Sequence, residues 1–239
     1  MEETYSTKVI MLNSFPFREN DSKTIIYSVD RGKLELVARG ARKIGSKLAG
    51  HIEPISLADV MVVKGRQYDY VGGAVSNNCY GIIKSDLDKL QIAGKAIRIF
   101  NKLVRPEQKD ENIYILLQEF LDEINKKDLS ADYELLYNFF ILKLLVLLGY
   151  SPELYYCAEC RRKIKPKRNK FDFLKGGIVC DSCKTGNSLT ISENCIKVMR
   201  FVINREFANI SKLKIENNTN NEIKRIICSF LEYRFGGCL

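Results

Sequence analysis

Residues 24–38 have the sequence TIIYSVDRGKLELVA, and this stretch decides the fold of the first part of the chain. Two runs rich in β-branched and apolar residues, Thr24–Val29 and Lys33–Ala38, flank the polar segment Asp30-Arg31-Gly32. A short polar segment with a glycine between two such runs is typical of a β-hairpin. The stretch therefore predicts two adjacent antiparallel strands.

Further strands are expected on both sides of this hairpin. Period-two patterning predicts three of them, at Thr7–Leu12, Ile55–Val63 and Tyr68–Val71. Turn signals separate the strands, at Asn20-Asp21-Ser22, Lys64-Gly65 and Gly72-Gly73. Five short strands are too few for a sandwich and favour a small barrel, for which the five-stranded OB-fold is the candidate.

After Tyr80 the apolar pattern becomes helical. Five helices are predicted, at Ser85–Val104, Glu111–Lys126, Ser130–Leu148, Ser192–Phe207 and Asn220–Phe235. Ser85 and Ser130 are the expected N-caps of the first and third helices. The apolar face expected for the first helix consists of Leu87, Leu90, Ala93, Ile97 and Phe100. The predicted fold class is α+β, with an OB-fold barrel over residues 1–80 followed by an α-helical domain over residues 81–239.

Two Cys-x-x-Cys pairs interrupt the helical part. Cys157-Ala158-Glu159-Cys160 and Cys180-Asp181-Ser182-Cys183 are separated by nineteen residues. Two such turns together supply the four tetrahedral thiolates of a structural Zn²⁺ site. The sequence therefore predicts an inserted zinc finger at about residues 150–185, with Cys157, Cys160, Cys180 and Cys183 as metal ligands, a strand at Phe171-Asp172-Phe173 and a turn at Gly176-Gly177. Two reduced, buried cysteine pairs without metal are the alternative interpretation.

Positive charge is concentrated in particular segments of the chain, whose 239 residues carry a net charge of +9. A basic balance favours a polyanionic partner such as nucleic acid, although ribosome-bound and membrane-surface proteins share it. Residues 31–47 contain six cations against one acid, Glu35, and these cations are the predicted DNA-binding residues: Arg31, Lys33, Arg39, Arg42, Lys43 and Lys47. A solvated loop without a ligand is the alternative.

Other basic and aromatic residues give weaker indications. Residues 161–175, between the two cysteine pairs, are more basic still and form either a second phosphate-contacting patch or a solubilising loop. Lys95, Arg98, Lys102 and Arg105 recur at helical spacing, as in the exposed stripe of an amphipathic helix or in a site for an acidic peptide. Tyr68 and Tyr70 are expected on one face of a strand, where bases could stack or where the rings could belong to the core.

No catalytic motif is visible in the sequence. It contains no P-loop, no HExxH and no G-x-S-x-G, and its single histidine, His51, cannot form a histidine metal cluster. A four-thiolate site is coordinatively closed, which argues against a zinc hydrolase. The chain is therefore expected not to be an enzyme. Because Met1-Glu2-Glu3-Thr4 does not resemble a signal peptide and the longest apolar stretch, Phe139–Leu148, is too short to span a bilayer, a cytoplasmic location with no membrane partner is expected.

Several of these segments resemble the bacterial recombination mediator family RecO. The resemblance rests in the N-terminal part on Arg18-Glu19-Asn20-Asp21, Gly32-Lys33, Arg39-Gly40-Ala41-Arg42-Lys43 and Ser46. In the cysteine region it rests on Leu147-Leu148-Gly149-Tyr150-Ser151-Pro152, on the first Cys-x-x-Cys pair, and on Phe171 with the run from Gly176 to Cys183. It covers about residues 7–190 and is most specific at the cysteines.

The resemblance implies a function in DNA recombination and repair. It implies binding of single-stranded and double-stranded DNA, annealing of complementary strands, contact with the C-terminal tail of single-strand-binding protein, and, together with RecR, loading of RecA on single-stranded DNA. It also implies that zinc supports the fold rather than the activity. For the tail of single-strand-binding protein it indicates only a region, near Lys102 and Arg105.

Three other functions remain open from the sequence. The chain could be an RNA- or ribosome-associated zinc-ribbon protein, for which a preference for structured RNA would be the sign. It could be an adaptor for single-strand-binding protein that binds no DNA. A nuclease is disfavoured by the closed thiolate site and by the lack of a carboxylate cluster.

Overall fold

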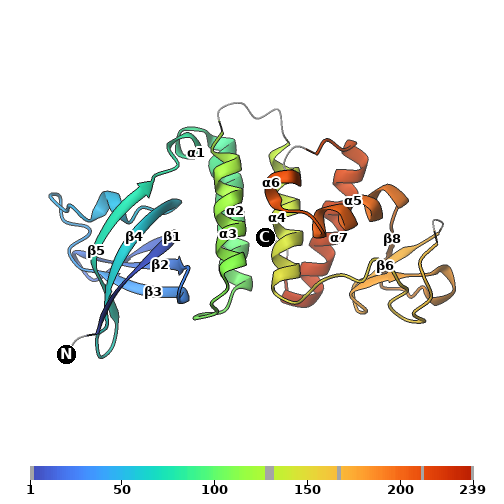
Figure 1. Ribbon diagram of the computed structural model, residues 1–239, viewed down its shortest axis with the longest axis horizontal. Helices are drawn as coiled ribbons and strands as arrows, with labels where there is room; N and C mark the ends of the chain where they lie inside the picture. The colour runs from blue at the N-terminus through green and yellow to red at the C-terminus, as the bar shows by residue number, and fades with distance from the viewer. Residues whose placement is uncertain (1–2, 127–131, 166–167, 211–212, 238–239) are drawn as a thin grey trace. The chain divides into compact units, whose positions relative to one another are not determined.

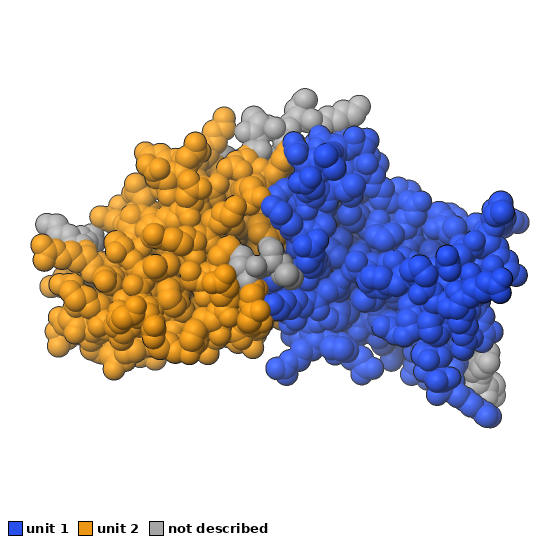
Figure 2. Space-filling model, turned by 180° about the vertical axis from the view of Figure 1, so that it is seen from behind, with its two compact units in different colours: residues 1–127 blue, residues 128–239 orange. Residues whose placement is uncertain are grey.

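The computed structural model describes residues 3–126, 132–165, 168–210 and 213–237, and Figure 1 labels their helices and strands. Two compact units make up the chain, Met1–Lys127 and Asp128–Leu239, which are coloured separately in Figure 2. The first unit contains the barrel together with the first three helices. The expected domain boundary at residue 80 marks the change from strands to helices along the sequence. The two compact units instead place the first three helices with the barrel.

The first unit is built on a closed five-stranded barrel (Figure 1). The strands are β1 (Thr4–Phe17), β2 (Asp21–Ser28), β3 (Gly32–Ala38), β4 (Ser56–Val63) and β5 (Asp69–Asn78). Their order around the barrel is β1-β2-β3-β5-β4, with β3 and β5 parallel and all other pairs antiparallel. Ser28 pairs with Gly32 across the predicted hairpin turn. The predicted α+β class with an N-terminal five-stranded barrel is confirmed.

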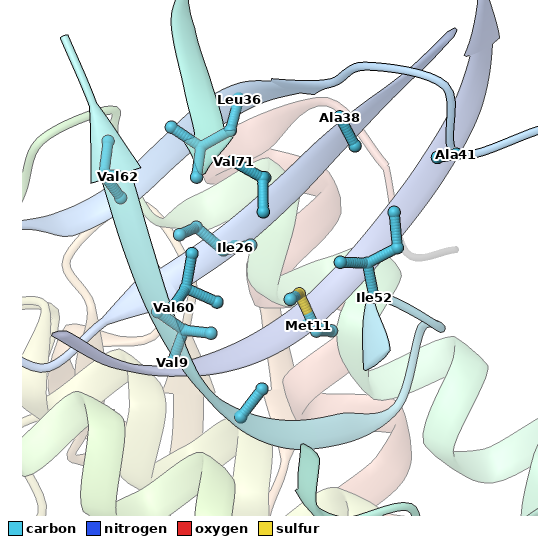
Figure 3. Close-up of a cluster of buried hydrophobic side chains, with 11 residues drawn as sticks. Val9, Met11, Ile26, Leu36, Ala38, Ala41, Ile52, Val60, Val62 and Val71 are labelled. Atoms are coloured by element: carbon cyan, nitrogen blue, oxygen red, sulfur yellow. The ribbon is translucent and has the colours of Figure 1, made fainter. Parts of the chain in front are cut away.

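Alternation along the strands fills the barrel interior. In β4, residues 56, 58, 60 and 62 are buried, whereas Asp59 and Met61 between them are exposed. Val9, Met11, Ile26, Val60 and Val62 point into the interior and have no exposed surface (Figure 3). Full burial of such a side chain contributes about 1.5–3 kcal/mol, so this apolar set fixes which face of each strand points inward.

Two strands extend beyond their predicted ends. Gly72 and Gly73, expected as a turn, lie within β5. A Cβ at Gly72 would lie 2.8 Å from Met61 Cε and 2.8 Å from Val63 Cγ2, so here glycine allows close approach of two strands. The strand β1 likewise continues to Phe17. Glycine residues occur both in turns and at irregular positions within strands. The sequence alone therefore did not show that this pair lies inside a strand.

The start of β5 also differs from the prediction. Tyr68 precedes β5, so it does not share a strand face with Tyr70. The strand β4 begins at Ser56, because Ile55 adopts a positive φ of 56° that ends the preceding connection.

Three helices complete the first unit: α1 (Gly81–Ser85), α2 (Leu87–Leu103) and α3 (Glu111–Ile124). The N-cap of α2 is Asp86, whose carboxylate accepts from the N–H groups of Asp88 (3.0 Å) and Lys89 (3.1 Å). The predicted cap at Ser85 is therefore wrong. Ser85 ends α1, and its hydroxyl donates to Ile82 O at 3.1 Å.

The buried face of α2 is only partly the predicted one. Ala93, Ile97 and Phe100 are buried as expected, but Leu87 is 69% exposed and Leu90 37% exposed. Buried residues on a neighbouring stripe take their place: Ile92, Ala96 and Ile99. Because α2 carries apolar residues on more than one stripe, spacing alone could not select the one that packs.

The second unit is helical with a small inserted sheet. Its helices are α4 (Tyr133–Leu147), α5 (Glu193–Ile203), α6 (Phe207–Ile210) and α7 (Asn217–Phe235), and its strands are β6 (Lys170–Asp172), β7 (Gly177–Val179) and β8 (Ser188–Thr190), in sheet order β7-β6-β8. The helix α4 is buried over most of its circumference, as predicted for a core helix. Within the described ranges no helix is long and apolar enough to cross a membrane.

Element ends in the second unit shift by a few residues. Asp132 caps α4 by accepting from Glu134 N at 2.9 Å, and the predicted cap Ser130 lies outside the described residues. Ser192, where this helix was expected to begin, is the N-cap of α5, and the helix ends at Ile203 and not at Phe207. The predicted strand around Phe171 is β6.

Candidate metal centre and nucleic-acid interface

The four cysteines of the two Cys-x-x-Cys pairs lie together in the second unit. Their sulfur atoms are all within 4.8 Å of one another. Cys160 Sγ and Cys180 Sγ are 3.8 Å apart, which is too far for a disulfide bond of about 2.05 Å. The four thiols are free cysteines arranged as one cluster.

The spacing of these sulfurs fits a zinc ion. Zn–S bonds of about 2.3 Å in a tetrahedron place neighbouring sulfurs about 3.8 Å apart. The separation of the Cys160 and Cys180 sulfurs is that distance, and the other pairs need to move by less than about 1 Å to reach it. Because four thiolates without carboxylates form a soft donor set, zinc fits the cluster better than magnesium or calcium. These four residues could therefore hold a structural metal ion.

Backbone hydrogen bonds bring the two cysteine pairs together. Arg161 N donates to Cys157 O at 2.9 Å, and Arg161 has a positive φ of 59° that closes the first turn. Cys183 N donates to Cys180 O at 3.0 Å in the second turn. The two turns are joined by Ala158 N, which donates to Ile178 O at 2.8 Å. These backbone hydrogen bonds hold the two cysteine turns side by side.

Gly177 allows the segment around Glu153 to approach the start of β7. Glu153 and Gly177 form a parallel bridge, in which Ile178 N donates to Glu153 O at 2.8 Å. A Cβ at Gly177 would lie 2.6 Å from Glu153 O and 2.9 Å from Glu153 N. The predicted turn at Gly176-Gly177 is correct for Gly176, which has φ 65°, whereas Gly177 begins β7.

The pKa values of the thiols differ within the cluster. Burial opposes ionisation of Cys157, but backbone N–H groups of Cys180, Cys160 and Glu159 lower its pKa to about 6. The side chain of Cys180 and desolvation raise the pKa of Cys183 to about 12. Four adjacent thiolates repel one another, so only a cation can hold all of them ionised.

On the barrel, the predicted DNA-binding residues fall into two groups. Arg39, Arg42, Lys43 and Lys47 are exposed in the connection that follows β3, here called the 39–47 segment. This segment is fixed to the β1–β2 turn: Arg42 N donates to Asn20 O at 3.0 Å, and Arg42 Nη1 donates to Glu19 O at 3.2 Å. Four cations therefore lie on one ordered connection.

Arg31 and Lys33 occupy different surroundings. The guanidinium of Arg31 lies over the Tyr5 ring, 4.5 Å from its centroid, beside the carboxylate-bearing residues Asp69 and Glu107. Lys33 Nζ donates to Asn101 O at 2.7 Å and to Val104 O, at the C-terminal end of α2. Burial lowers the pKa of Lys33. Its ammonium group caps the helix end, where a cation is favourable, and so faces inward.

Next to the 39–47 segment lies a cluster of aromatic and basic side chains, here called the rim cluster: Phe17, Arg18, Lys23, Arg39, Tyr68 and Tyr70. The Arg39 guanidinium lies 3.9 Å from the centroid of the Tyr70 ring. Phe17 and Tyr68 pack edge to face at 5.5 Å. Lys23 Nζ lies 5.1 Å from the Phe17 ring and 5.4 Å from the Tyr68 ring.

Sequence reasoning found only part of the rim cluster. It identified Arg39 by charge and the two tyrosines as candidates, but it missed Phe17 and Lys23. The available signal was the pair Phe17-Arg18 beside a turn, where an arginine can lie over a neighbouring ring. Both tyrosines are half-buried rather than core residues.

The other two basic regions differ in their surroundings. In the 161–175 region, Arg161 pairs with Glu153 at 3.4 Å and Lys175 with Glu159, while Arg162, Lys163 and Arg168 are exposed. Lys167 lies outside the described residues. On α2, Arg98 and Lys102 are exposed.

Fold and site together define a class: an OB-type barrel protein whose helical domain carries a four-cysteine knuckle. Two family models match the chain, described as Recombination protein O N terminal over residues 1–78 and Recombination protein O C terminal over residues 84–239. The chain belongs to the recombination protein O family, RecO.

Relatives of similar length support this assignment. The DNA repair protein RecO of Desulforamulus reducens is 28% identical over 231 residues, covering 96% of this chain and 89% of that protein. The DNA repair protein RecO of Dehalococcoides mccartyi is 30% identical over 224 residues, covering 93% and 87%. That of a Roseiflexus species is 27% identical over 234 residues, covering 97% and 81%. The predicted resemblance to this family is confirmed.

Proposed function

We propose that this chain is a DNA-binding recombination mediator of DNA repair. It holds single-stranded DNA on the barrel and anneals complementary strands without hydrolysing a nucleotide. Membership in a family whose relatives are named DNA repair proteins supports the repair function. The observation that carries the DNA-binding part is the 39–47 segment, four exposed cations that begin at the Arg39–Tyr70 stack.

The chemistry of this surface suits single-stranded nucleic acid. Phosphates bind to Arg42, Lys43 and Lys47, while bases stack on exposed faces of the rim cluster. Arg39 suits both roles, since its guanidinium plane stacks on rings and its N–H groups bind phosphate. Neutralising phosphates lowers the repulsion between two strands, which is what annealing requires. Contacts of this kind are independent of sequence.

The four-cysteine cluster is proposed to hold a structural zinc ion through Cys157, Cys160, Cys180 and Cys183. When bound, zinc would supply four bonds that fix the knuckle. A closed four-thiolate shell has no position for a reacting water, so the ion would have no catalytic role. The chain is accordingly proposed to act by binding rather than by catalysis.

The partners proposed for this chain follow from the family. Together with RecR, and through the C-terminal tail of single-strand-binding protein, the chain would promote RecA loading on single-stranded DNA. The tail is acidic and requires a basic site, for which exposed cations such as Lys102 and Arg105 offer the right charge. Double-stranded DNA would bind to the same cations through its phosphates.

A strand-annealing assay tests the proposal. Complementary oligonucleotides coated with single-strand-binding protein are mixed with the intact chain without ATP. A variant with Arg39, Arg42 and Lys43 changed to Glu is compared with a control in which the exposed cations Lys8, Lys109 and Lys214 are changed to Glu, which has the same net charge. Annealing by the intact and control proteins but not by the first variant is expected. Failure of the intact protein to anneal would overturn the function, and equal loss in both variants would show an effect of net charge alone.

A further inference from the structure

The second unit has a basic groove of its own, apart from the cysteine cluster. It lies between α5 and the segment that enters β6, and the residues that line it are Ile164, Lys165, Asn169, Glu193, Ile196, Lys197 and Arg200. Three of them are cations and one is an acid. Lys197 pairs with Glu193 at 2.7 Å, and its side chain remains 64% exposed. The groove therefore has a net positive lining.

An aromatic ring stands at the Arg200 end of this groove. The Arg200 guanidinium lies 4.5 Å from the centroid of the Tyr155 ring, and Arg200 Nε donates to Leu154 O at 3.1 Å. Asn204 Nδ2 donates to the Tyr155 hydroxyl at 3.0 Å. These contacts hold the ring in one orientation, yet Tyr155 is 47% exposed.

A second stack of the same kind follows on α5. Phe201 is 40% exposed, and the Arg205 guanidinium lies 5.8 Å from the centroid of its ring. Asn204 and Arg205 directly follow Ile203, the last residue of α5, so both contacts lie at the C-terminal end of this helix. Exposed rings beside arginines, next to a basic groove, are the features that bind bases and phosphates of single strands.

We infer that this surface is a second site for single-stranded DNA, in which a base stacks on Tyr155 and phosphates bind to Lys165 and Lys197. The inference rests on the proposed function and deepens it. Annealing needs two strands held at once, and the barrel surface accounts for one. A half-exposed ring held by an arginine and an asparagine is pre-ordered for stacking, so little entropy is lost when a base binds.

Nucleic acid fits this surface better than an acidic peptide does. An acidic peptide would contact the cations alone. Its binding would not explain why an aromatic ring is held exposed in one orientation. If Arg200 served only to bind the carbonyl oxygen of Leu154, the ring of Tyr155 would have no reason to be exposed. Single-stranded DNA uses the ring and the cations together.

The test compares two substitutions of Tyr155 in the full chain. Tyr155→Leu removes the ring, and Tyr155→Phe keeps the ring but removes the bond from Asn204. Each is made in the intact background and in a background with Arg39, Arg42 and Lys43 changed to Gln, which weakens the barrel surface. Binding of a labelled single-stranded oligonucleotide is measured by fluorescence anisotropy, and thermal melting checks that all variants fold alike.

Tyr155→Leu is expected to weaken binding by about fivefold or more in both backgrounds, and Tyr155→Phe by less than about twofold. An oligonucleotide carrying 5-iodouracil should photocrosslink to Tyr155 in the intact chain. If the barrel variant binds DNA but is insensitive to Tyr155→Leu, the inference is overturned while the proposed function stands. If the intact chain binds no DNA, the proposed function itself fails. Unchanged DNA binding with weakened binding of the acidic tail peptide would assign the groove to a peptide and overturn the inference.

Discussion

The salt dependence of DNA binding gives the sharpest test of the barrel surface, because its size follows from the number of exposed cations. The 39–47 segment presents four: Arg39, Arg42, Lys43 and Lys47. Each phosphate neutralised on a single strand contributes about −0.7 to the slope of log affinity against log salt concentration. The four contacts of this segment therefore contribute about −2.8 to the slope.

This slope translates into a measurable loss of affinity. A fourfold rise in salt, for example from 50 to 200 mM, should weaken binding about 50-fold. With Arg39, Arg42 and Lys43 changed to Gln, one of the four contacts of this segment remains. The contribution of the segment to the slope falls to about −0.7, so the same rise in salt weakens its share of binding about 2.6-fold. Glutamine is used because it removes charge without adding repulsion.

The assay is anisotropy of a labelled oligonucleotide titrated with protein at five or more salt concentrations. A double-logarithmic plot gives the slope directly. Gln substitutions at Lys8, Arg98 and Lys109, which are exposed and lie outside the 39–47 segment, form the matched control. A slope near zero for the intact chain would refute phosphate binding, and an unchanged slope in the first variant would refute the choice of residues.

Four other predictions concern single features of the two units. Removal of zinc by a chelator should lower the melting temperature, because binding of the ion is coupled to folding; a calorimetric midpoint that is unchanged after the metal is removed would contradict a structural role. Gly177→Ala should destabilise the protein by about 2 kcal/mol, because the added Cβ clashes with Glu153 and backbone hydrogen bonds are lost. Gly186→Ala, whose added Cβ has no atom within 4 Å, should leave stability nearly unchanged, and equal urea midpoints for the two variants would refute the prediction. Burial raises the pKa of Tyr27 to about 12, so folded protein keeps this phenol protonated above pH 10 while unfolded chains ionise it. The contribution of Tyr27 to stability should therefore fall by about 1.4 kcal/mol per pH unit between pH 10 and 12, and Tyr27→Phe should make the decline of the urea midpoint less steep. Tyr70→Leu should weaken single-stranded DNA binding by about 1–3 kcal/mol and duplex binding less, since bases within a duplex are already stacked; equal losses for both would argue against stacking.

The parts of the fold that depend on local alternation were predictable. The hairpin around Asp30 combines two apolar runs with Gly32, whose positive φ of 71° glycine adopts without the strain that a side chain brings. The close approach at Gly32 also requires glycine, since an added Cβ would lie 2.3 Å from Gln108 O. Gln108 lies 76 positions after Gly32 in the sequence. The turn at Gly32 was therefore predictable, but its close contact with Gln108 was not.

The parts that depend on choosing between neighbouring signals were not predictable. At the start of α2, Ser85 and Asp86 are both good caps, and the choice is made by α1, a one-turn helix that ends on Ser85. At Gly72 the same residue type that indicates a turn was required by the Met61 and Val63 side chains of the adjacent strand. At Gly72 the deciding contact comes from another strand, and at Ser85 it comes from a one-turn helix that the apolar pattern did not predict.

The candidate sites, like the fold, were predictable in part. The four cysteines were predictable because metal coordination leaves a spacing rule in the sequence, and the structure brings all four sulfurs within 4.8 Å. Charge density predicted the 39–47 segment, but it also selected Lys33, whose ammonium group caps α2. Charge counts do not distinguish a cation that faces solvent from one that satisfies helix carbonyls.

The rim cluster shows what an improved sequence rule would require. Phe17 ends β1, Lys23 lies near the start of β2, and Arg39 follows β3. Tyr68 directly precedes β5, and Tyr70 is the second residue of that strand. In a barrel of order β1-β2-β3-β5-β4, the antiparallel pairs β1–β2 and β2–β3 and the parallel pair β3–β5 each bring residues from separate segments together. Lys23 pairs with both Phe15 and Val37, and Val37 pairs with Tyr70, so the register alone connects these positions across three strand pairs. A search for cations and aromatics at the ends of strands that the barrel order makes neighbours would therefore have found the cluster, whereas a search along the sequence could not.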